Sequence, residues 1–220
     1  MKNLSEFRCV RFLVFALLAA ILLFSCSDPE SPPVTDDPGY DRSSPDNLMV
    51  MLAGSYKEKD LAGYDECLDE DFLFQFTEEV ADELGLKPSE PWWGKTADLM
   101  STMDMFEHPY VQDVVFSFEA LEDWEPHVEV RPDTTFSGYF RRFDPLIEVT
   151  TQIDGSEDPV RKYRVDHSWL DVVVVPDRFT EGLWRIVRID EVEKQPGTAL
   201  GSAAAATEGS TWGGIKAMWH

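Results

Sequence analysis

The sequence predicts an α+β fold, in which short helices come first and long antiparallel strands follow. Apolar residues recur at helical spacing between residues 45 and 68, whereas beyond Pro109 they alternate with a period of two. With 220 residues, 43% of them hydrophobic, the chain is long enough for one domain with a packed core and additional tails.

Three helices and one strand are expected in the first half of the chain. Residues 44–47 (Ser-Pro-Asp-Asn) supply a capping side chain, a first-turn proline and an acid suited to a helix N-terminus. A second helix should open at residues 59–60 and place Tyr64, Cys67 and Leu68 on one face. We expect a strand within residues 71–76, one or two helical turns over 78–84, and a third full helix over 96–106.

Four strand regions are expected to follow, at residues 114–120, 134–153, 161–175 and 183–192. The second should break at Asp144-Pro145, because proline interrupts a strand ladder, and residues 154–155 (Asp-Gly) indicate a hairpin turn. Residues 195–210, rich in Gly, Ala, Ser and Thr, predict a flexible linker. Apolar residues return from 212 to 219, and we expect them to pack on the domain as a short strand.

The N-terminal 25 residues have the features of a secretory signal. Lys2, Arg8 and Arg11 precede an apolar run of 13 residues, which is shorter than a membrane-spanning helix needs. The run ends in Leu-Phe-Ser-Cys26, which resembles the lipobox of bacterial lipoproteins, whose cysteine becomes an acylated N-terminus. The alternative is an ordinary cleaved signal followed by an incidental cysteine.

These observations predict four parts of the chain: a signal peptide at 1–25, acylated Cys26 with a disordered tether to residue 43, a domain at 44–194, and a linker with an apolar C-terminal segment at 195–220. The protein is accordingly expected in the bacterial cell envelope, at the outer membrane or the periplasmic face, with the membrane as its partner through Cys26. Of the three cysteines, Cys67 alone would remain in the domain, as a buried structural residue without a disulfide.

Charge and motifs exclude several functions. Lys and Arg number 19 against 42 Asp and Glu, a net charge of -23, which argues against nucleic-acid binding. The acidic run at 65–71 lacks the spacing and the glycine of a calcium loop. We find no glycine-rich phosphate loop, no zinc-binding histidine pair, no Cys-x-x-Cys and no Gly-x-Ser-x-Gly, so no metal and no cofactor are predicted.

The order of these elements resembles the nuclear transport factor 2-like superfamily, which includes SnoaL-like and ketosteroid isomerase-like domains. The resemblance rests on residues 44–48, 59–61, 71–74, 93–94 and 183–187, together with Tyr64, and covers residues 44–194. It implies a cone, in which a strongly curved antiparallel sheet wraps around three helices from the N-terminal half. Enzymes of this group place a general-base Asp and a Tyr or Asp donor inside the cone. No residue of this sequence takes over these roles by motif, so no catalytic residue is predicted.

The strand at 161–175 suggests a pocket. Alternation places His167 on the same face as Tyr163, Val165 and Trp169, an otherwise aromatic and aliphatic face, with Asp190 or Tyr64 as its polar partner. The predicted pocket inside the cone is lined by Tyr64, Trp93, Phe116, His167, Trp169 and Asp190. The alternatives are that His167 is a half-buried residue with a structural partner, and that the aromatic residues simply fill the cone.

Three functions are consistent with these features. The first is a lipid-anchored, non-enzymatic envelope domain that binds a small apolar ligand or another protein. The second is an isomerase, cyclase or hydrolase that uses His167 with an acidic residue. The third is a structural module that forms a homodimer through its sheet. A water-accessible cavity beside His167 would favour the enzyme, and a cone filled with aromatic side chains would favour the structural module.

Overall fold

The computed structural model describes residues 41–152, 160–165, 168–194 and 208–218. Its helices are α2 (Pro45–Glu58), α3 (Leu61–Cys67), α4 (Glu78–Glu83), α5 (Lys95–Glu107) and α6 (Trp212–Ala217). Its strands are β1 (Leu68–Gln75), β2 (Trp92–Gly94), β3 (Val111–Ala120), β4 (Glu125–Val130), β5 (Thr135–Gln152), β6 (Val160–Val165), β7 (Ser168–Pro176), β8 (Trp184–Glu193) and β9 (Glu208–Ser210). The predicted α+β class is confirmed. Within these residues, no helix is long and apolar enough to cross a membrane.

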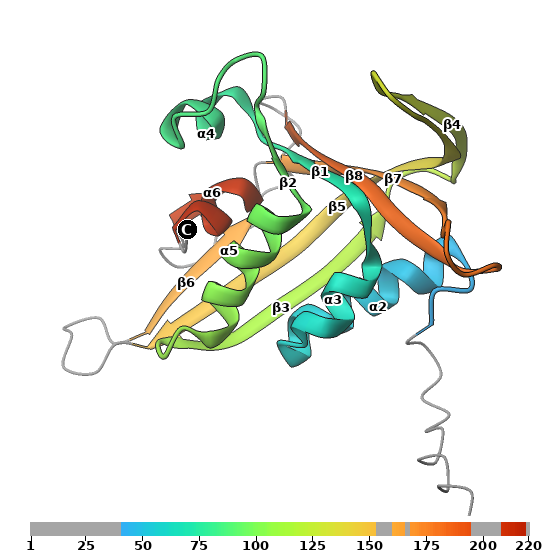
Figure 1. Ribbon diagram of the computed structural model, residues 1–220. Helices are drawn as coiled ribbons and strands as arrows, with labels where there is room; N and C mark the ends of the chain where they lie inside the picture. The colour runs from blue at the N-terminus through green and yellow to red at the C-terminus, as the bar shows by residue number, and fades with distance from the viewer. Residues whose placement is uncertain (1–40, 153–159, 166–167, 195–207, 219–220) are drawn as a thin grey trace, which may run out of the picture. The chain divides into compact units, whose positions relative to one another are not determined.

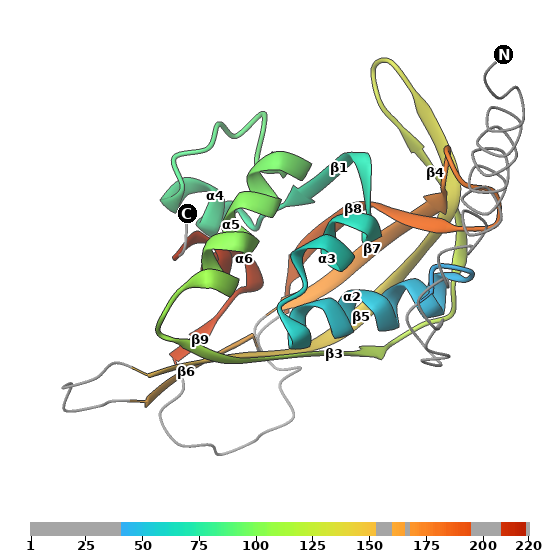
Figure 2. The same cartoon turned by 60° about the horizontal axis from the view of Figure 1, so that its bottom comes forward.

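The strands form one strongly curved sheet, whose concave side is covered by helices (Figure 1). Neighbours along the sheet run β2-β1-β8-β7-β5-β6-β9, and β3 and β4 pair with the other edge of β5. Helices α2, α3, α5 and α6 all lie against this concave side, as a second view also shows (Figure 2). We call this side the inner face of the sheet and the opposite side its outer face. The curved sheet wrapped on helices is the cone that the resemblance implies, and its described pairs are antiparallel except for β1–β8 and β6–β9.

The first helices begin where the sequence predicts, because their caps are in place. Ser44 accepts a hydrogen bond from the Asn47 amide, and Asp60 accepts one from the Ala62 amide. The domain nevertheless starts before residue 44. The guanidinium of Arg42 is buried and donates to Asp177 at 2.9 Å, so the last residues of the predicted tether pack on the domain.

Strand β5 runs without interruption through Pro145, where the sequence predicts a break. Pro145 pairs with Phe118 of β3 on one edge. On the other edge, the described pairing with β7 ends at Phe143 and that with β6 begins at Ile147. The proline therefore lies at the junction between two partner strands, a place where its missing N–H disturbs the ladder least.

The predicted continuous alternation through residues 161–175 is wrong by one residue. Ile147 of β5 pairs with Val165 of β6, and Phe143 of β5 pairs with Leu170 of β7. The two β5 residues are four positions apart, whereas their partners are five positions apart. In β6 the odd-numbered residues therefore face inward, whereas in β7 the even-numbered residues face inward. A shift of one residue sends every later side chain to the opposite face.

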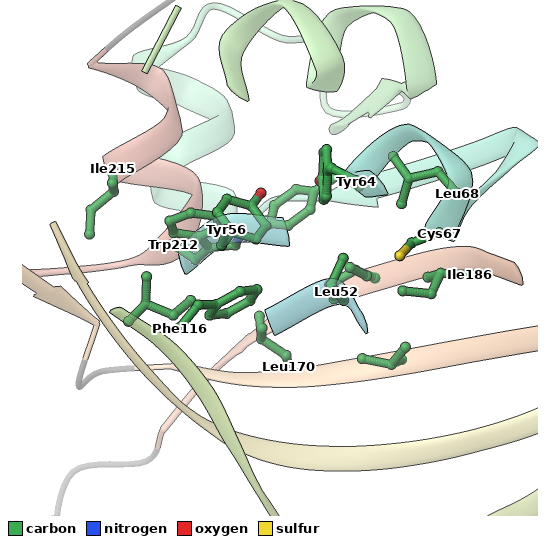
Figure 3. Packing of buried hydrophobic residues seen from close by; sticks show 14 of the residues in the cluster. Leu52, Tyr56, Tyr64, Cys67, Leu68, Phe116, Leu170, Ile186, Trp212 and Ile215 are labelled. Carbon is green, nitrogen blue, oxygen red and sulfur yellow. The ribbon is translucent and has the colours of Figure 1, made fainter. Parts of the chain in front are cut away.

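The core lies between the inner face and the helices, and aromatic rings fill its centre (Figure 3). Tyr56 of α2 contacts Tyr64, Phe116 and Trp212, with ring centroids 4.9, 4.6 and 5.2 Å away. The C-terminal segment thus packs into the domain, as a helix rather than the expected strand. Thr211 caps α6 by accepting from the Gly214 amide at 3.0 Å.

Candidate functional site

Helix α6 buries one face against the sheet and the other helices. Trp212, Ile215 and Lys216 lie at positions i, i+3 and i+4, so they share one face of the helix, and each is at most 1% exposed. The Trp212 ring stacks on Phe116 of β3 at 5.5 Å between centroids (Figure 3). The side chains that fill the cone centre therefore come partly from the chain's own C-terminus.

The ammonium of Lys216 binds a buried acid and a buried hydroxyl. Its Nζ forms an ion pair with Oδ1 of Asp98 and lies 3.1 Å from the Tyr64 hydroxyl. The Tyr64 hydroxyl in turn donates to Oδ2 of Asp98 at 2.6 Å. Both Asp98 oxygens are thus engaged, and the three side chains are 0–1% exposed. We call Tyr64, Asp98 and Lys216, together with the ring of Phe74, the Lys216 site.

Aromatic rings surround the same ammonium. Nζ lies 4.9 Å from the centroid of Phe74, 5.3 Å from that of Trp212 and 5.5 Å from that of Tyr64. Ring faces at such distances attract a cation, more strongly where water is excluded. The Lys216 site therefore compensates the loss of hydration of the ammonium by a carboxylate, a hydroxyl and ring faces.

Burial changes the protonation of this site. Burial lowers the pKa of Lys216, and the charge of the Asp98 carboxylate opposes this shift without cancelling it. Burial, and after it the charge of Asp98, raises the pKa of Tyr64 well above its usual value. The tyrosine thus stays protonated and remains a hydrogen-bond donor to Asp98.

A second acid, Glu191 of β8, holds the backbone of α6. Its carboxylate accepts from the amides of Trp212 and Gly213, the latter at 3.0 Å, and from the Ser168 hydroxyl at 2.9 Å. Burial raises the pKa of Glu191 to about 7, although these hydrogen bonds lower it. Gly213 permits the close approach, because a Cβ there would lie 2.4 Å from a ring carbon of Phe76 and 2.8 Å from Glu191 Oε2.

The structure brings together some of the predicted pocket residues. Tyr64 belongs to the Lys216 site, and Phe116 stacks on Trp212 in the same interior. Trp93 of β2 is buried in the same core and packs its ring against Phe76, which lies next to Gly213. His167 lies outside the described residues.

Trp169 and Asp190 lie on the outer face instead. The Trp169 ring is covered by the guanidinium of Arg142, 5.2 Å from its centroid. Asp190 pairs with Arg188 at 3.0 Å and stands opposite Asp171 across the β7–β8 pair. Trp169 is displaced by the one-residue shift between β6 and β7, whereas Asp190 simply alternates with the inward-facing Glu191.

The outer face carries an ion-pair network that holds the β4–β5 hairpin. Arg188 of β8 pairs with Glu129 of β4 at 2.6 Å, and Arg142 makes two hydrogen bonds, of 2.6 and 2.7 Å, to Asp171. Burial raises the pKa of Asp190 to about 6, against the opposing charge of Arg188. Arg142, Arg188 and Asp190 of this network are partly exposed, whereas Glu129 and Asp171 are buried.

Sequence reasoning missed three residues of the interior: Asp98, Glu191 and Lys216. Asp98 lies in the predicted third helix, but neither its neighbours nor its spacing mark it as buried. One signal is present at the C-terminus, where Ile215 and Lys216 follow Trp212 by three and four positions, the spacings that share a face with Trp212 if the segment is helical. The described part of the chain holds no group of three or more His, Cys, Asp or Glu residues arranged for a metal ion.

No protein-family model and no curated protein matches this sequence. Among solved structures, it is similar to a conserved protein from Planctomyces limnophilus, with 15% identity and a TM-score of 0.43 over 67% of this chain and 92% of that one. A nuclear transport factor 2-like superfamily protein from Salmonella enterica serovar Typhimurium matches at 12% identity and a TM-score of 0.40, over 70% and 92% of the two chains. A nuclear transport factor 2-like protein of unknown function from Pseudomonas putida matches at 10% and 0.37, over 74% and 90%.

The structural neighbours thus include proteins of the group that the sequence resembles. At these identities the likeness concerns the course of the chain alone, and it gives neither a ligand nor a reaction.

Proposed function

We propose that this protein is a lipid-anchored module of the bacterial cell envelope that binds a ligand inside its cone and is not an enzyme. One observation carries the proposal: Lys216 engages both Asp98 and the Tyr64 hydroxyl inside the cone. A general base needs a carboxylate that can take a proton from a substrate. With α6 in place, Asp98 is 0% exposed and both its oxygens have partners.

A cone filled with aromatic side chains is the outcome expected of a structural module, but part of that filling is Trp212 of α6. The contacts of α6 with the rest of the cone are of the kind that a receptor makes with a bound peptide. Glu191 binds the backbone of α6, the Phe116 ring stacks on Trp212, and Asp98 binds the ammonium of Lys216. A helix of six residues is unstable by itself, so α6 owes its structure to these contacts. Breaking them frees the interior while leaving the strand pairs β1–β8, β8–β7 and β7–β5 in place, which makes α6 a candidate for local opening.

The interior part of the proposal is tested by thiol labelling of a buried position in α6. In the variant Ile215→Cys, the new thiol competes with the native Cys67, which is buried and free. Peptide mass spectrometry then follows both thiols in the same molecules. A binding module labels at position 215 faster than at Cys67, by about tenfold or more, because α6 opens without global unfolding. Equal rates at the two positions would instead make α6 a permanent part of the core.

The anchor is tested separately by Cys26→Ser. The wild type should fractionate with membranes and incorporate labelled palmitate, and the variant should do neither, because it lacks the thiol that is acylated. Ser27→Ala is the matched control, since it alters the neighbouring residue and leaves the thiol in place. Membrane association of Cys26→Ser, together with a wild type that takes up no palmitate, would contradict the anchor.

A second candidate function follows from the Tyr64 hydroxyl and Asp98, which lie 2.6 Å apart inside the cone. Once α6 leaves, a carboxylate beside a hydroxyl donor could move a proton on a carbonyl compound. The two candidates differ in a simple assay, the exchange of α-protons of a ketone such as cyclohexanone in D₂O, followed by NMR. Exchange that is catalysed by a chain with displaced α6 and is lost with Asp98→Asn would favour the enzyme. The binding module leaves the ketone unchanged.

A further inference from the structure

We infer that the interior of the cone is a site for a primary ammonium group, and that Lys216 is the occupant that the chain itself supplies. The inference rests on the proposed function, because it names the class of ligand for the same interior. The ligand is an unbranched alkylammonium, either free or as a lysine side chain.

The carboxylate, the hydroxyl and the Phe74 ring that contact the ammonium belong to the cone, whereas the Trp212 ring belongs to α6. Tyr64 comes from α3, Phe74 from β1 and Asp98 from α5, and they are held by elements far apart in the chain. Tyr64 and Asp98 also bind one another, at 2.6 Å, so the hydroxyl and the carboxylate are aligned whatever occupies the position of Nζ. The recognition chemistry therefore remains when the lysine side chain is removed.

The geometry favours a primary ammonium over other cations. Oδ2 of Asp98 already accepts from the Tyr64 hydroxyl, and Oδ1 has the ammonium as its partner. A guanidinium binds best through two parallel hydrogen bonds to both oxygens of a carboxylate, and here one of these bonds would have to share Oδ2 with the Tyr64 hydroxyl. A quaternary ammonium has no N–H to donate to Oδ1 or to the Tyr64 hydroxyl. A primary ammonium satisfies both acceptors and presents its charge to the Phe74 ring, 4.9 Å away.

The alternative is that the Lys216 site serves only to fasten α6, with no capacity to bind an amine. The two differ in what happens after Lys216→Ala. That substitution removes Cγ, Cδ, Cε and Nζ, whose atoms correspond to n-propylammonium. It leaves a carboxylate, a hydroxyl and ring faces around a space of that size, since Lys216 is fully enclosed.

The experiment measures the thermal stability of the full-length Lys216→Ala variant with increasing n-propylammonium chloride at constant ionic strength. We expect a saturable rise of roughly 3–6 °C at about ten times the dissociation constant. Equal concentrations of 1-propanol, guanidinium and tetramethylammonium should give less than a third of that rise. If n-propylammonium raises the melting temperature no more than these do, the inference is overturned.

The matched control is Lys216→Ala combined with Asp98→Asn, which leaves no buried unpaired charge and should fold. Its melting temperature should not respond to n-propylammonium, and an equal response would show binding elsewhere and overturn the inference. Should Lys216→Ala alone not fold, the yield of soluble protein on refolding with each additive replaces the melting temperature. Equal yields with n-propylammonium and 1-propanol would likewise overturn it.

The outcomes separate the inference from the proposed function. Rescue by n-propylammonium, together with equal labelling of positions 215 and 67 in Ile215→Cys, would keep the ammonium site and reject the binding module. Fast labelling without rescue would keep an opening cone and reject the ammonium as its ligand class.

Discussion

The two faces of the sheet use the same ion-pair chemistry under opposite conditions. In the helical layer against the inner face, Lys216 of α6 and Asp98 of α5 are 1% and 0% exposed and have no contact with bulk water. On the outer face, the side chains of Arg142 and Asp171 are 30% and 11% exposed. The inner pair joins the end of the chain to the cone, whereas the outer pair joins neighbouring strands β5 and β7 that are already hydrogen bonded.

The difference lies in what a broken pair leaves behind. A partly exposed arginine that loses its partner is hydrated, so the loss is small. A buried lysine that loses its carboxylate has no water to replace it, and the cost is several times larger. The inner side thus binds the only charged side chain of α6 through a single acid, Asp98, whereas the outer face spreads its charges over a network that tolerates change.

The largest effect is expected from Asp98→Asn, which leaves the ammonium of Lys216 buried without its counter-ion. We expect a loss of about 3–5 kcal/mol in the free energy of unfolding. The same substitution on the outer face, Asp171→Asn, should cost about 1 kcal/mol, because Arg142 is partly hydrated. Urea unfolding of both variants measures the difference, and equal losses would erase the contrast between the faces.

The pH dependence of Glu191 gives the next largest effect. Its pKa in the folded protein is about 7, raised from 4.5, so the folded state binds this proton more tightly than the unfolded chain. The resulting stabilisation is complete below about pH 4.5 and is lost as the pH rises through 7. Relative to Glu191→Gln, the wild type should lose about 3 kcal/mol between pH 4.5 and 7.5.

Asp190, the next residue on the opposite face, is the control for this titration. Burial raises the pKa of Asp190 from 3.8 to about 6, so its protonation stabilises the folded state at low pH. This stabilisation is lost from the wild type as the pH rises through about 6, and Asp190→Asn should lack this pH dependence. Unfolding free energies at pH 4.5, 6 and 7.5 separate the two carboxyls. A Glu191→Gln difference that no longer changes above pH 6 would contradict the burial of Glu191 beneath α6.

Two adjacent glycines test the fit of α6 to the inner face. Gly213→Ala would place a Cβ 2.4 Å from the Phe76 ring, so we expect α6 to be displaced at a cost of about 1–3 kcal/mol. Gly214→Ala meets only the Thr211 hydroxyl, at 3.1 Å, and should change stability by less than about 1 kcal/mol. Thermal unfolding and the fluorescence of Trp212 compare the two variants. A Gly214→Ala loss as large as that of Gly213→Ala would show that the close approach to Phe76 is unimportant.

The smallest effect is expected at the exposed end of the outer face. Lys162 pairs with Glu148 at 2.6 Å, but the lysine side chain is 53% exposed. Lys162→Ala should change the free energy of unfolding by less than about 0.5 kcal/mol in urea. A loss comparable with that of Asp98→Asn would mean that burial does not set the strength of these pairs.

The sequence predicts the course of the chain better than its interior. Caps such as Ser44 and Asp60 act locally, so the starts of the first helices could be predicted directly. The face of Trp169 could not, because one extra residue opposite β5 reverses the alternation, and no residue type marks it. Lys216 was harder still, since a charged residue near a chain end is ordinarily exposed, and its partner Asp98 is 118 positions away.

The central claim, that α6 is a bound segment which leaves the cone without unfolding it, is tested most directly by amide hydrogen exchange in the native protein. The amides to compare are those of Trp212 and Gly213, bound to Glu191, and that of Val172 in the middle of β7. We predict exchange at 212 and 213 through a local opening, at least tenfold faster than at 172 and little affected by low urea concentrations. Exchange of all three amides at one rate, with the same urea dependence as global unfolding, would contradict the claim.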